Sequence, residues 1–365
     1  LAGEWADAAS PYGPVWEWLS LGAYHLSGGR YLAHLFSLKI LSLLAYTGSI
    51  WLVYRILDLI RPRWAIQGSA FFAWNPLVLL ESVQNGHNDI VMAFFLLVAV
   101  WAFTKLLVGM QNRPKMLFES LFVLGFAAAI LVKFIPVVVL PFFLLALAWQ
   151  QLGWSQRIGG LLSRGLAVAL IVILAMLPYW LQMEGWALLH AGKSAGRSLI
   201  ALLVLALRSH LGTNPAFDYV NLFIYLILGI VYLVSLLQLW RELVANRTGA
   251  SRATTIFKAT IFASMSVFFW YVLLGASTFH AWYLLWFLPL AALLVPRDRP
   301  TGAAVVVSLA ALLVIPYYET VRVWFPILLQ KQVLGHIIGV SLVLIPSMWA
   351  WFRPVDLLSH GPNEQ

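Results

Sequence analysis

A short polar segment between two apolar runs, Asn85-Gly86-His87-Asn88-Asp89, carries residue types that can do acid–base chemistry. An imidazole and a carboxylate can exchange protons, and both can ligate a metal ion. Asn88 or Asp89 would cap the apolar helix that follows, which explains one of them but not His87 or the nearby Glu81. The N-terminus of that helix would also favour an anion such as phosphate. The motif therefore predicts a proton-transfer, metal or anion site, with a simple helix cap as the alternative.

Lys133 lies in the apolar stretch 117–150, close to Pro136 and Pro141. The stretch is too long for one membrane span, so we expect it to form a tight helical hairpin that turns near its middle. A charge in such surroundings needs a partner or a charged ligand, unless the side chain extends to the membrane interface. An ammonium is a compact positive charge that suits a phosphate. Lys133 thus predicts either an interfacial anchor or a contact to a lipid-linked phosphate.

Two aromatic segments offer surfaces for a sugar ring. In Phe279-His280-Ala281-Trp282-Tyr283, an aromatic ring could stack on a sugar while His280 donates hydrogen bonds to its hydroxyls. In Ser10-Pro11-Tyr12-Gly13-Pro14, two prolines make a rigid turn around Tyr12, and Pro14 suits the first position of a helix. Anchoring at the membrane interface, where Trp and Tyr collect, is the alternative for both segments.

The composition says what kind of protein must position these residues. Of 365 residues, 62% are hydrophobic and only 10% are charged, against about 25% charged in soluble domains. This excludes a disordered chain and an ordinary cytosolic enzyme, and the absence of cysteine excludes a disulfide scaffold. The net charge of +9 comes from basic residues scattered between apolar runs. That scatter is typical of the positive-inside bias of membrane proteins and does not indicate a nucleic-acid partner.

The apolar runs predict an all-α, polytopic transmembrane protein with one domain over residues 1–365. A helix needs roughly 20 apolar residues to cross the bilayer. We expect a shorter interfacial helix at 14–28 and a further amphipathic segment at 198–210. About eleven spans are expected, at 32–56, 64–82, 89–108, 117–132, 134–150, 164–181, 218–240, 256–275, 281–296, 301–317 and 333–352.

Lys and Arg divide unequally between the two ends of these spans, fifteen against eight. The richer side is predicted to be cytoplasmic, which places the C-terminus inside and the segments 1–31 and 182–215 outside. Arg197 violates this bias, and we interpret it as an anion-binding residue. Ionisable groups near hydrocarbon are costly and mark functional sites. The acidic and histidine residues gather at the external ends: Glu4, Asp7, Glu17, Glu81, Asp89, Glu184, Asp218, Glu319, His87, His190, His210 and His280.

Four segments in this order resemble one known family: SPYGPVW, NGHNDIVMAFFLL, LVKFIPVVVLPF and FHAWYLLWFLPLAAL. They are similar to the bacterial GT-C glycosyltransferases that use polyprenyl-phosphate-mannose, and most of all to the alpha-(1→6)-mannopyranosyltransferases. The likeness runs from Tyr12 to about Leu293. It implies inverting transfer of a hexose from a lipid monophosphate donor to a glycan or glycolipid acceptor outside the plasma membrane. It implies no cofactor and leaves a divalent metal open.

In this family the expected base is an acidic residue in the first external loop, just after the first span. The chain begins inside or after that loop, so we expect it to lack the first span and that acid. Asp89 and His87 match the His-Asn-Asp loop and would lie beside the reacting sugar. Lys133, with Arg197, would neutralise the departing phosphate. The remaining substrate contacts implied by the resemblance are Tyr12, Asn88, His280, Trp282 and Tyr283, with Ala281 standing where a proline is commoner.

Two other classes of protein share part of this pattern. A secondary transporter or flippase for a sugar or lipid-linked sugar also has proline-interrupted spans and an intramembrane lysine. Ion-coupled transporters place carboxylates in mid-span, whereas here the acidic residues lie at span ends. A structural subunit fits the apolar composition but leaves the outer polar cluster unexplained. The sequence therefore favours a membrane glycosyltransferase.

Overall fold

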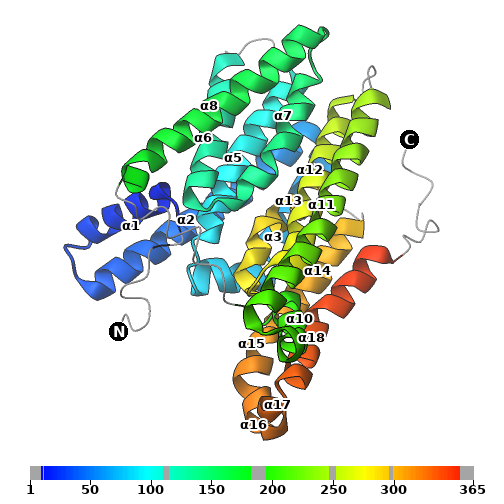
Figure 1. Ribbon diagram of the computed structural model, residues 1–365. Coiled ribbons are helices and arrows are strands. Elements are labelled where there is room, and N and C mark those ends of the chain that lie inside the picture. The colour runs from blue at the N-terminus through cyan, green and yellow to red at the C-terminus, as the bar shows by residue number, and fades with distance from the viewer. Residues whose placement is uncertain are drawn as a thin grey trace.

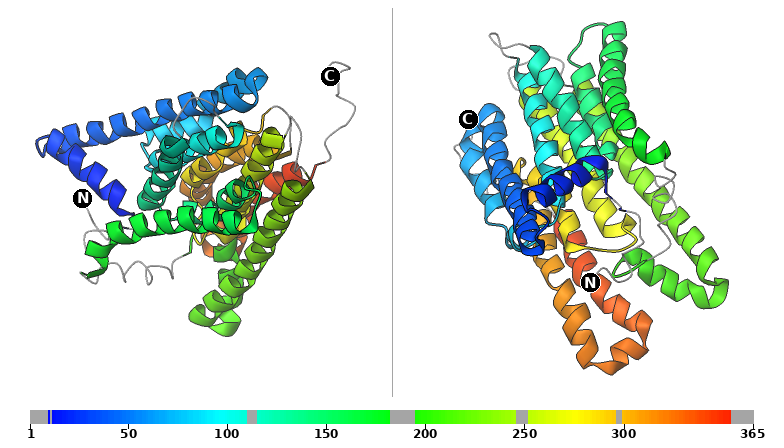
Figure 2. Two further views of the ribbon diagram at one scale, coloured as in Figure 1. Left: turned by 90° about the horizontal axis from the view of Figure 1, so that it is seen from above. Right: turned by 90° about the vertical axis from the view of Figure 1, so that its left-hand side faces the viewer.

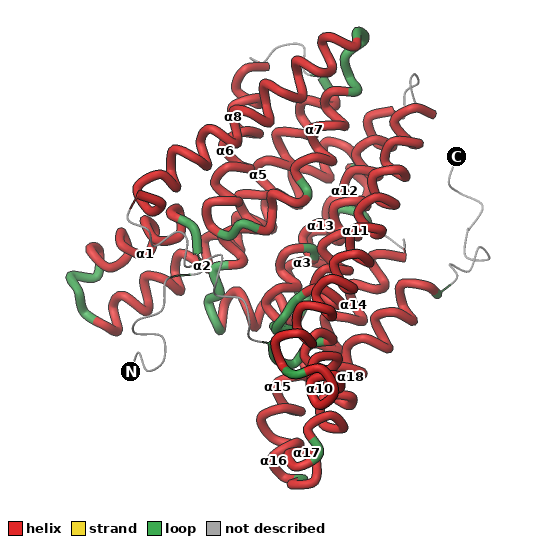
Figure 3. Tube along the Cα trace, viewed as in Figure 1, coloured by secondary structure: helices red, strands yellow, loops and turns green. Residues whose placement is uncertain are grey.

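The computed structural model describes residues 10, 12–109, 115–181, 195–245, 252–295 and 299–353, and its regular elements are helices (Figures 1 and 3). Within these ranges the one isolated β-bridge joins Gly196 and Thr278. The predicted all-α polytopic fold is confirmed. Eight described helices are long and apolar enough to cross a membrane: Tyr31–Ile60, Asp89–Val108, Lys115–Val132, Trp154–Leu181, Thr213–Ala245, Arg252–Gly275, Pro300–Trp324 and Gln332–Phe352.

Three of the expected spans are short, broken helices instead of continuous ones. Each break has a proline, which cannot donate the backbone hydrogen bond that a continuing helix needs. In the first, Asn75 restarts the chain as a new helix by accepting hydrogen bonds from the amides of Leu77 and Val78. The broken segments are η2 (Pro62–Trp64), α3 (Ala65–Ala73) and α4 (Pro76–Leu79); η4 (Ile135–Val138) and α7 (Leu140–Ala148); η6 (Ala281–Trp286) and α13 (Leu288–Ala292).

Two helices form the centre of the bundle, α5 (Asp89–Val108) and α12 (Arg252–Trp270), and most of their side chains are buried. α5 packs along α6 (Lys115–Val132) and α2 (Tyr31–Ile60). By contrast, α8 (Trp154–Leu181) and α11 (Thr213–Ala245) expose long apolar faces. Such faces suit a hydrocarbon solvent. Figure 2 shows α1 (Pro14–Leu26) and α2 diverging from a shared tip, so that α2 returns to the bundle.

The turn before α1 is fixed by close backbone packing against the end of α6. The amide of Gly13 donates to the carbonyl of Val132 at 3.2 Å. A Cβ atom at position 13 would lie 2.3 Å from the carbonyl oxygen of Leu131, so a larger residue cannot make this approach. The turn therefore places Tyr12 beside Lys133. The predicted helix at 14–28 is present as α1, and Pro14 is its first residue.

Three helices widen into π-helical turns: η3 (Leu80–Gln84), η5 (Tyr271–Gly275) and η7 (Tyr317–Val321). Such turns are rare and often accompany functional sites. η3 leads into the loop with His87, and η5 leads into the loop with His280. The predicted amphipathic segment is also present, as α10 (Leu199–Leu211). Four of the expected external residues lie outside the described residues: Glu4, Asp7, Glu184 and His190.

Candidate active site

Asp89 and Lys133 form an ion pair at one end of two packed helices. Asp89 begins α5 and Lys133 directly follows α6. Lys133 Nζ donates to Asp89 Oδ1 at 2.8 Å, and the Asp89 side chain is 1% exposed while that of Lys133 is 17% exposed. The same Oδ1 accepts a hydrogen bond from Trp286 Nε1. A carboxylate in the first turn of a helix is also favoured by the helix dipole.

Aromatic rings surround the Lys133 ammonium. Nζ lies 4.9 Å from the centroid of the Tyr283 ring, 5.3 Å from Trp286 and 5.8 Å from Tyr12. These distances are within the range of cation–π attraction. Tyr283 and Trp286 stack on each other at 4.4 Å. The structure thus explains how a lysine is accommodated beside apolar spans: one carboxylate pairs with its charge and three rings contact it.

A second acidic residue, Glu81 on η3, pairs with His87. Glu81 Oε2 lies 3.2 Å from His87 Nε2, and the Glu81 side chain is fully buried while that of His87 is 28% exposed. Asn85 Nδ2 donates to the same oxygen at 2.9 Å. The loop between them is held by its own backbone, because the amide of His87 donates to the carbonyl of Glu81 at 3.0 Å.

Residues of α2 support this loop from the other side. Lys39 Nζ donates to the carbonyl of Gln84, and Ser42 Oγ donates to that of Gly86 at 3.2 Å. Gly86 has a φ of 71°, a conformation that side chains other than glycine rarely adopt. The loop is therefore fixed at both ends, which sets the position of the His87 ring.

Trp282 lies between two imidazole rings. Its ring stacks on His87 at 4.0 Å with an interplanar angle of 23°, and on His280 at 4.1 Å with an angle of 16°. Two imidazoles cannot both lie 4 Å from one centroid on the same face without overlapping, so they occupy opposite faces. The stack joins the His87 loop to the His280 loop.

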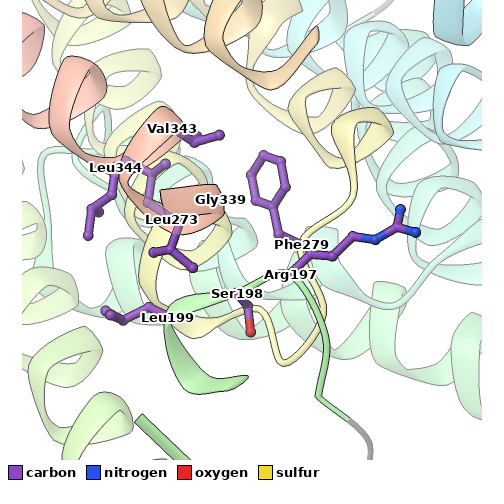
Figure 4. Close-up of a pocket in the computed structure, with 9 residues that line it drawn as sticks. Arg197, Ser198, Leu199, Leu273, Phe279, Gly339, Val343 and Leu344 are labelled. Atoms are coloured by element: carbon purple, nitrogen blue, oxygen red, sulfur yellow. The ribbon is translucent and has the colours of Figure 1, made fainter. Parts of the chain in front are cut away.

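Arg197 approaches the site through backbone contacts with the His280 loop. The amide of Phe279 donates to the carbonyl of Gly196 at 3.0 Å, and that of Gly196 donates to Ser277 at 3.1 Å. Arg197 has a φ of 57°, and its guanidinium pairs with Glu319 on η7. Figure 4 shows the Arg197 side chain pointing away from the apolar residues of α18 (Gln332–Phe352). The cavity between these elements measures about 10 Å³, about the space of one water molecule.

The surroundings shift the pKa values of two groups in these loops. Burial lowers the pKa of His280 to about 4, and the positive charges of Arg197 and Lys133 act in the same direction. His280 is therefore neutral at pH 7 and offers one donor and one acceptor. Burial raises the pKa of Tyr12, and the negative charge of Asp89 adds to the effect. Both groups thus act as neutral hydrogen-bonding side chains.

The structure brings most of the sequence-predicted site residues into one connected group. Asp89, Lys133, Tyr12 and Tyr283 meet around the ion pair, whereas His87, Trp282 and His280 form the stack. The remaining two lie at the edge: Asn88 is buried at the start of α5, and the Arg197 guanidinium is engaged by Glu319.

Three residues that contact the site were not among the predicted site residues: Trp286 beside Asp89, Glu81 beside His87 and Glu319 beside Arg197. Trp286 follows Trp282 by four residues in the same motif, which is the one local signal that could have indicated it. In the described part of the chain, no group of three or more His, Cys, Asp or Glu side chains is arranged to hold a metal ion.

Together, the fold and the site define a polytopic helical membrane protein with a buried ion pair, a histidine–carboxylate pair and aromatic rings at one end of its helices. Residues 1–149 match the sequence model of the alpha-(1→6)-mannopyranosyltransferase family, N-terminal domain. The matched region includes Tyr12, the 85–89 loop and Lys133. This match confirms the resemblance to the GT-C mannosyltransferases, and the protein is a glycosyltransferase. No curated protein and no solved structure matches the chain.

Proposed function

We propose that the protein transfers a hexose, mannose by the family match, from a polyprenyl-phosphate donor to a hydroxyl of a glycan or glycolipid acceptor. The observation that carries the proposal is the Asp89–Lys133 pair in its aromatic surroundings, within the region that matches the mannosyltransferase family. A lipid-linked phosphate has the charge that Lys133 would bind, and it can approach from the membrane. A sugar has the hydroxyls and the apolar ring faces that the neighbouring groups would contact.

In this reaction Lys133, with Arg197, stabilises the charge that develops on the departing phosphate. A phosphate leaving group needs little protonation, so cationic groups can replace a general acid. The Lys133 side chain is 17% exposed, so it is not closed off from an incoming phosphate. Arg197 would reach the phosphate by exchanging its partner Glu319, whose side chain is also exposed.

The sugar contacts come from the two loops that the stack joins. His87, Asn88 and Asp89 would contact or orient the reacting sugar, and His280 would hydrogen-bond to a hydroxyl. Because both faces of Trp282 are covered by imidazoles, a sugar meets its edge unless one imidazole rotates away. Tyr12 and Tyr283 add phenol groups next to Lys133.

The sidedness of the reaction is part of the proposal. The excess of Lys and Arg at the opposite span ends supports an extracytoplasmic site in the plasma membrane, with the C-terminus in the cytoplasm.

The test uses the protein in proteoliposomes with polyprenyl-phosphate-[¹⁴C]mannose and a mannan oligosaccharide acceptor. We expect Asp89→Asn and Lys133→Ala each to lower kcat/KM at least 100-fold. Glu119→Gln is the matched control, because Glu119 also pairs with a cation, Arg164 at 2.5 Å, but lies near the opposite end of α6. Near-normal transfer by both site variants would contradict the assignment, and sugar uptake without a new glycosidic bond would favour a transporter.

Arg197 has its own test in the same assay. Arg197→Gln should raise the KM for the donor about tenfold, which corresponds to about 1.4 kcal/mol of lost binding. Arg208→Gln is the control, since Arg208 is another exposed arginine nearby, bound to Gln332 at 3.0 Å. An equal effect of both variants would show that Arg197 contributes only general positive charge.

A further inference from the structure

A cluster of arginine and tryptophan side chains lies at the end of α7 that is farther along the chain from Lys133, and the proposed function does not use it. Its centre is Trp149, which directly follows α7. The Arg157 guanidinium lies 4.1 Å from the centroid of the Trp149 ring and 5.3 Å from that of Trp154. The Trp240 ring packs against Trp149 at 4.4 Å. The cluster thus joins α7 to α8 and α11, both of which contact α7.

Two arginines donate to backbone carbonyls at this end of α7. Arg252, the first residue of α12, donates from Nη2 to the carbonyl of Trp149 at 3.2 Å. Arg157 donates from Nε to the carbonyl of Gln151 at 2.8 Å. Positive charge is favourable at the carboxyl end of a helix, so capping α7 is the simplest role for both residues. In the described structure that role uses one N–H of each guanidinium, and a guanidinium has five.

The cluster has more positive charge and more donors than its described neighbours can match. Among the described residues, neither Arg157 nor Arg252 belongs to an ion pair. Trp149 Nε1 and Arg252 Nε are buried and have no hydrogen-bond partner in the same part of the chain. Buried donors without an acceptor are costly, and native structures keep few of them. The cluster therefore favours an anion that offers several acceptor oxygens.

The position of the cluster indicates a lipid as the source of that anion. Trp154 begins α8 and is 65% exposed, and Trp240 lies near the end of α11 and is 37% exposed. These two helices carry the long apolar faces that suit hydrocarbon, and Figure 1 shows the start of α8 and the end of α11 at the top of the view. Tryptophan collects at the level of the lipid headgroups. The excess of Lys and Arg predicts that this end faces the cytoplasm, where the leaflet carries anionic lipids.

We propose that this arginine–tryptophan cluster binds the headgroup phosphate of an anionic phospholipid. The phosphate oxygens accept from N–H groups that Arg157 and Arg252 leave unused, since a guanidinium matches a phosphate in shape as well as in charge. Because both arginines contact Trp149, one headgroup reaches both. The exposed rings of Trp154 and Trp240 pack along the glycerol and the first part of the acyl chains. A zwitterionic lipid binds more weakly, because its ammonium is repelled by the same guanidinium groups.

The experiment measures lipid binding to the detergent-purified protein by native mass spectrometry. The probes are phosphatidylglycerol, which is anionic, and phosphatidylcholine with the same acyl chains. We expect the wild type to bind one phosphatidylglycerol at least tenfold more tightly than phosphatidylcholine. Arg157→Gln and Arg252→Gln should each weaken phosphatidylglycerol binding about tenfold, a loss typical of hydrogen bonds to charged groups, and leave phosphatidylcholine binding unchanged within about twofold. Arg157→Lys should recover only part of the loss, because it keeps the charge but not the planar donor group.

Arg241→Gln is the matched control. Arg241 is an exposed arginine next to Trp240 in sequence, so its variant removes the same charge at the same end of α11. It should keep the wild-type affinity for phosphatidylglycerol within about twofold, in line with the small contribution of exposed charges. Thermal melting in detergent checks that each variant folds. If Arg252→Gln fails to fold, the comparison of Arg157→Gln with Arg157→Lys still tests the site.

Four results would overturn the proposal. These are wild-type affinity for phosphatidylglycerol in the folded glutamine variants, an equal loss in Arg241→Gln, equal affinity of the wild type for the two lipids, and displacement of phosphatidylglycerol by excess inorganic phosphate. The second result would assign binding to general positive charge, and the last would assign the site to a soluble anion. Sugar transfer is not measured here, so failure of the proposed function would leave this site standing, and the reverse also holds.

Discussion

The Asp89–Lys133 pair predicts an asymmetry between its two single variants. In Lys133→Met, a carboxylate that is 1% exposed keeps only the Trp286 N–H as its partner, because Asp89 Oδ2 accepts no hydrogen bond in the described structure. Removing one partner of a buried pair in this way costs about 3–5 kcal/mol. In Asp89→Asn, the ammonium is 17% exposed and keeps three aromatic rings within 6 Å. Those contacts contribute about 0.5–2 kcal/mol each.

We therefore expect Lys133→Met to lower the free energy of unfolding by about 2 kcal/mol more than Asp89→Asn does. This is roughly a 30-fold difference in the unfolding equilibrium constant. The assay is reversible unfolding of the detergent-solubilised protein by SDS titration, followed by circular dichroism. The double variant should be more stable than Lys133→Met alone, because it leaves no uncompensated carboxylate. The reasoning is that Lys133 compensates the buried charge of Asp89. Equal losses in the free energy of unfolding for the two single variants, or additive losses in the double variant, would refute it.

Two further predictions concern the loops of the site. Because the pKa of folded His280 is about 4 and the ordinary value is 6.5, the unfolded chain binds the proton first, so stability falls as pH drops from 6.5 to 4. His280→Gln should flatten that decline in melting temperature, and an unchanged pH dependence would assign it to other groups. Gly13→Ala should lower the free energy of unfolding by about 2 kcal/mol, because its Cβ would clash with the backbone of Leu131, and it should lower transferase activity. Gly22→Ala is the control within α1, where a Cβ meets no atom within 4 Å; equal melting temperatures would refute the clash.

The fold was largely predictable because the lipid bilayer restricts the structures that an apolar segment can form. Apolar runs of sufficient length become helices, since the backbone must satisfy its hydrogen bonds within each segment. The three misjudged spans contain prolines at 76, 136, 141 and 289, and Pro62 lies just before the first of them. There the hydropathy of the run is high enough for a span, but the backbone cannot continue one helix through it.

The site was predictable as a set of motifs but not as a set of contacts. The residue types of the His87 loop and the isolation of Lys133 in an apolar stretch indicated chemistry from the sequence alone. Their partners depend on helix packing: Asp89 and Lys133 meet because α5 and α6 lie side by side. Trp286 is 197 residues from Asp89, and Glu319 is 122 residues from Arg197. No local pattern encodes such pairs without the packing of the whole bundle.

The three π-helical turns give the site a dependence on chain length. A π-helical turn takes up more residues than an α-helical turn, and each of these turns lies where its helix delivers a residue to the site, at Leu80–Gln84, Tyr271–Gly275 and Tyr317–Val321. A residue inserted into a helix that stays α-helical rotates all that follows by about 100° around its axis, whereas a π-helical turn takes up the extra residue locally. Loops elsewhere can absorb small insertions or deletions. In these three helices, the number of residues is as much a part of the site as their identity.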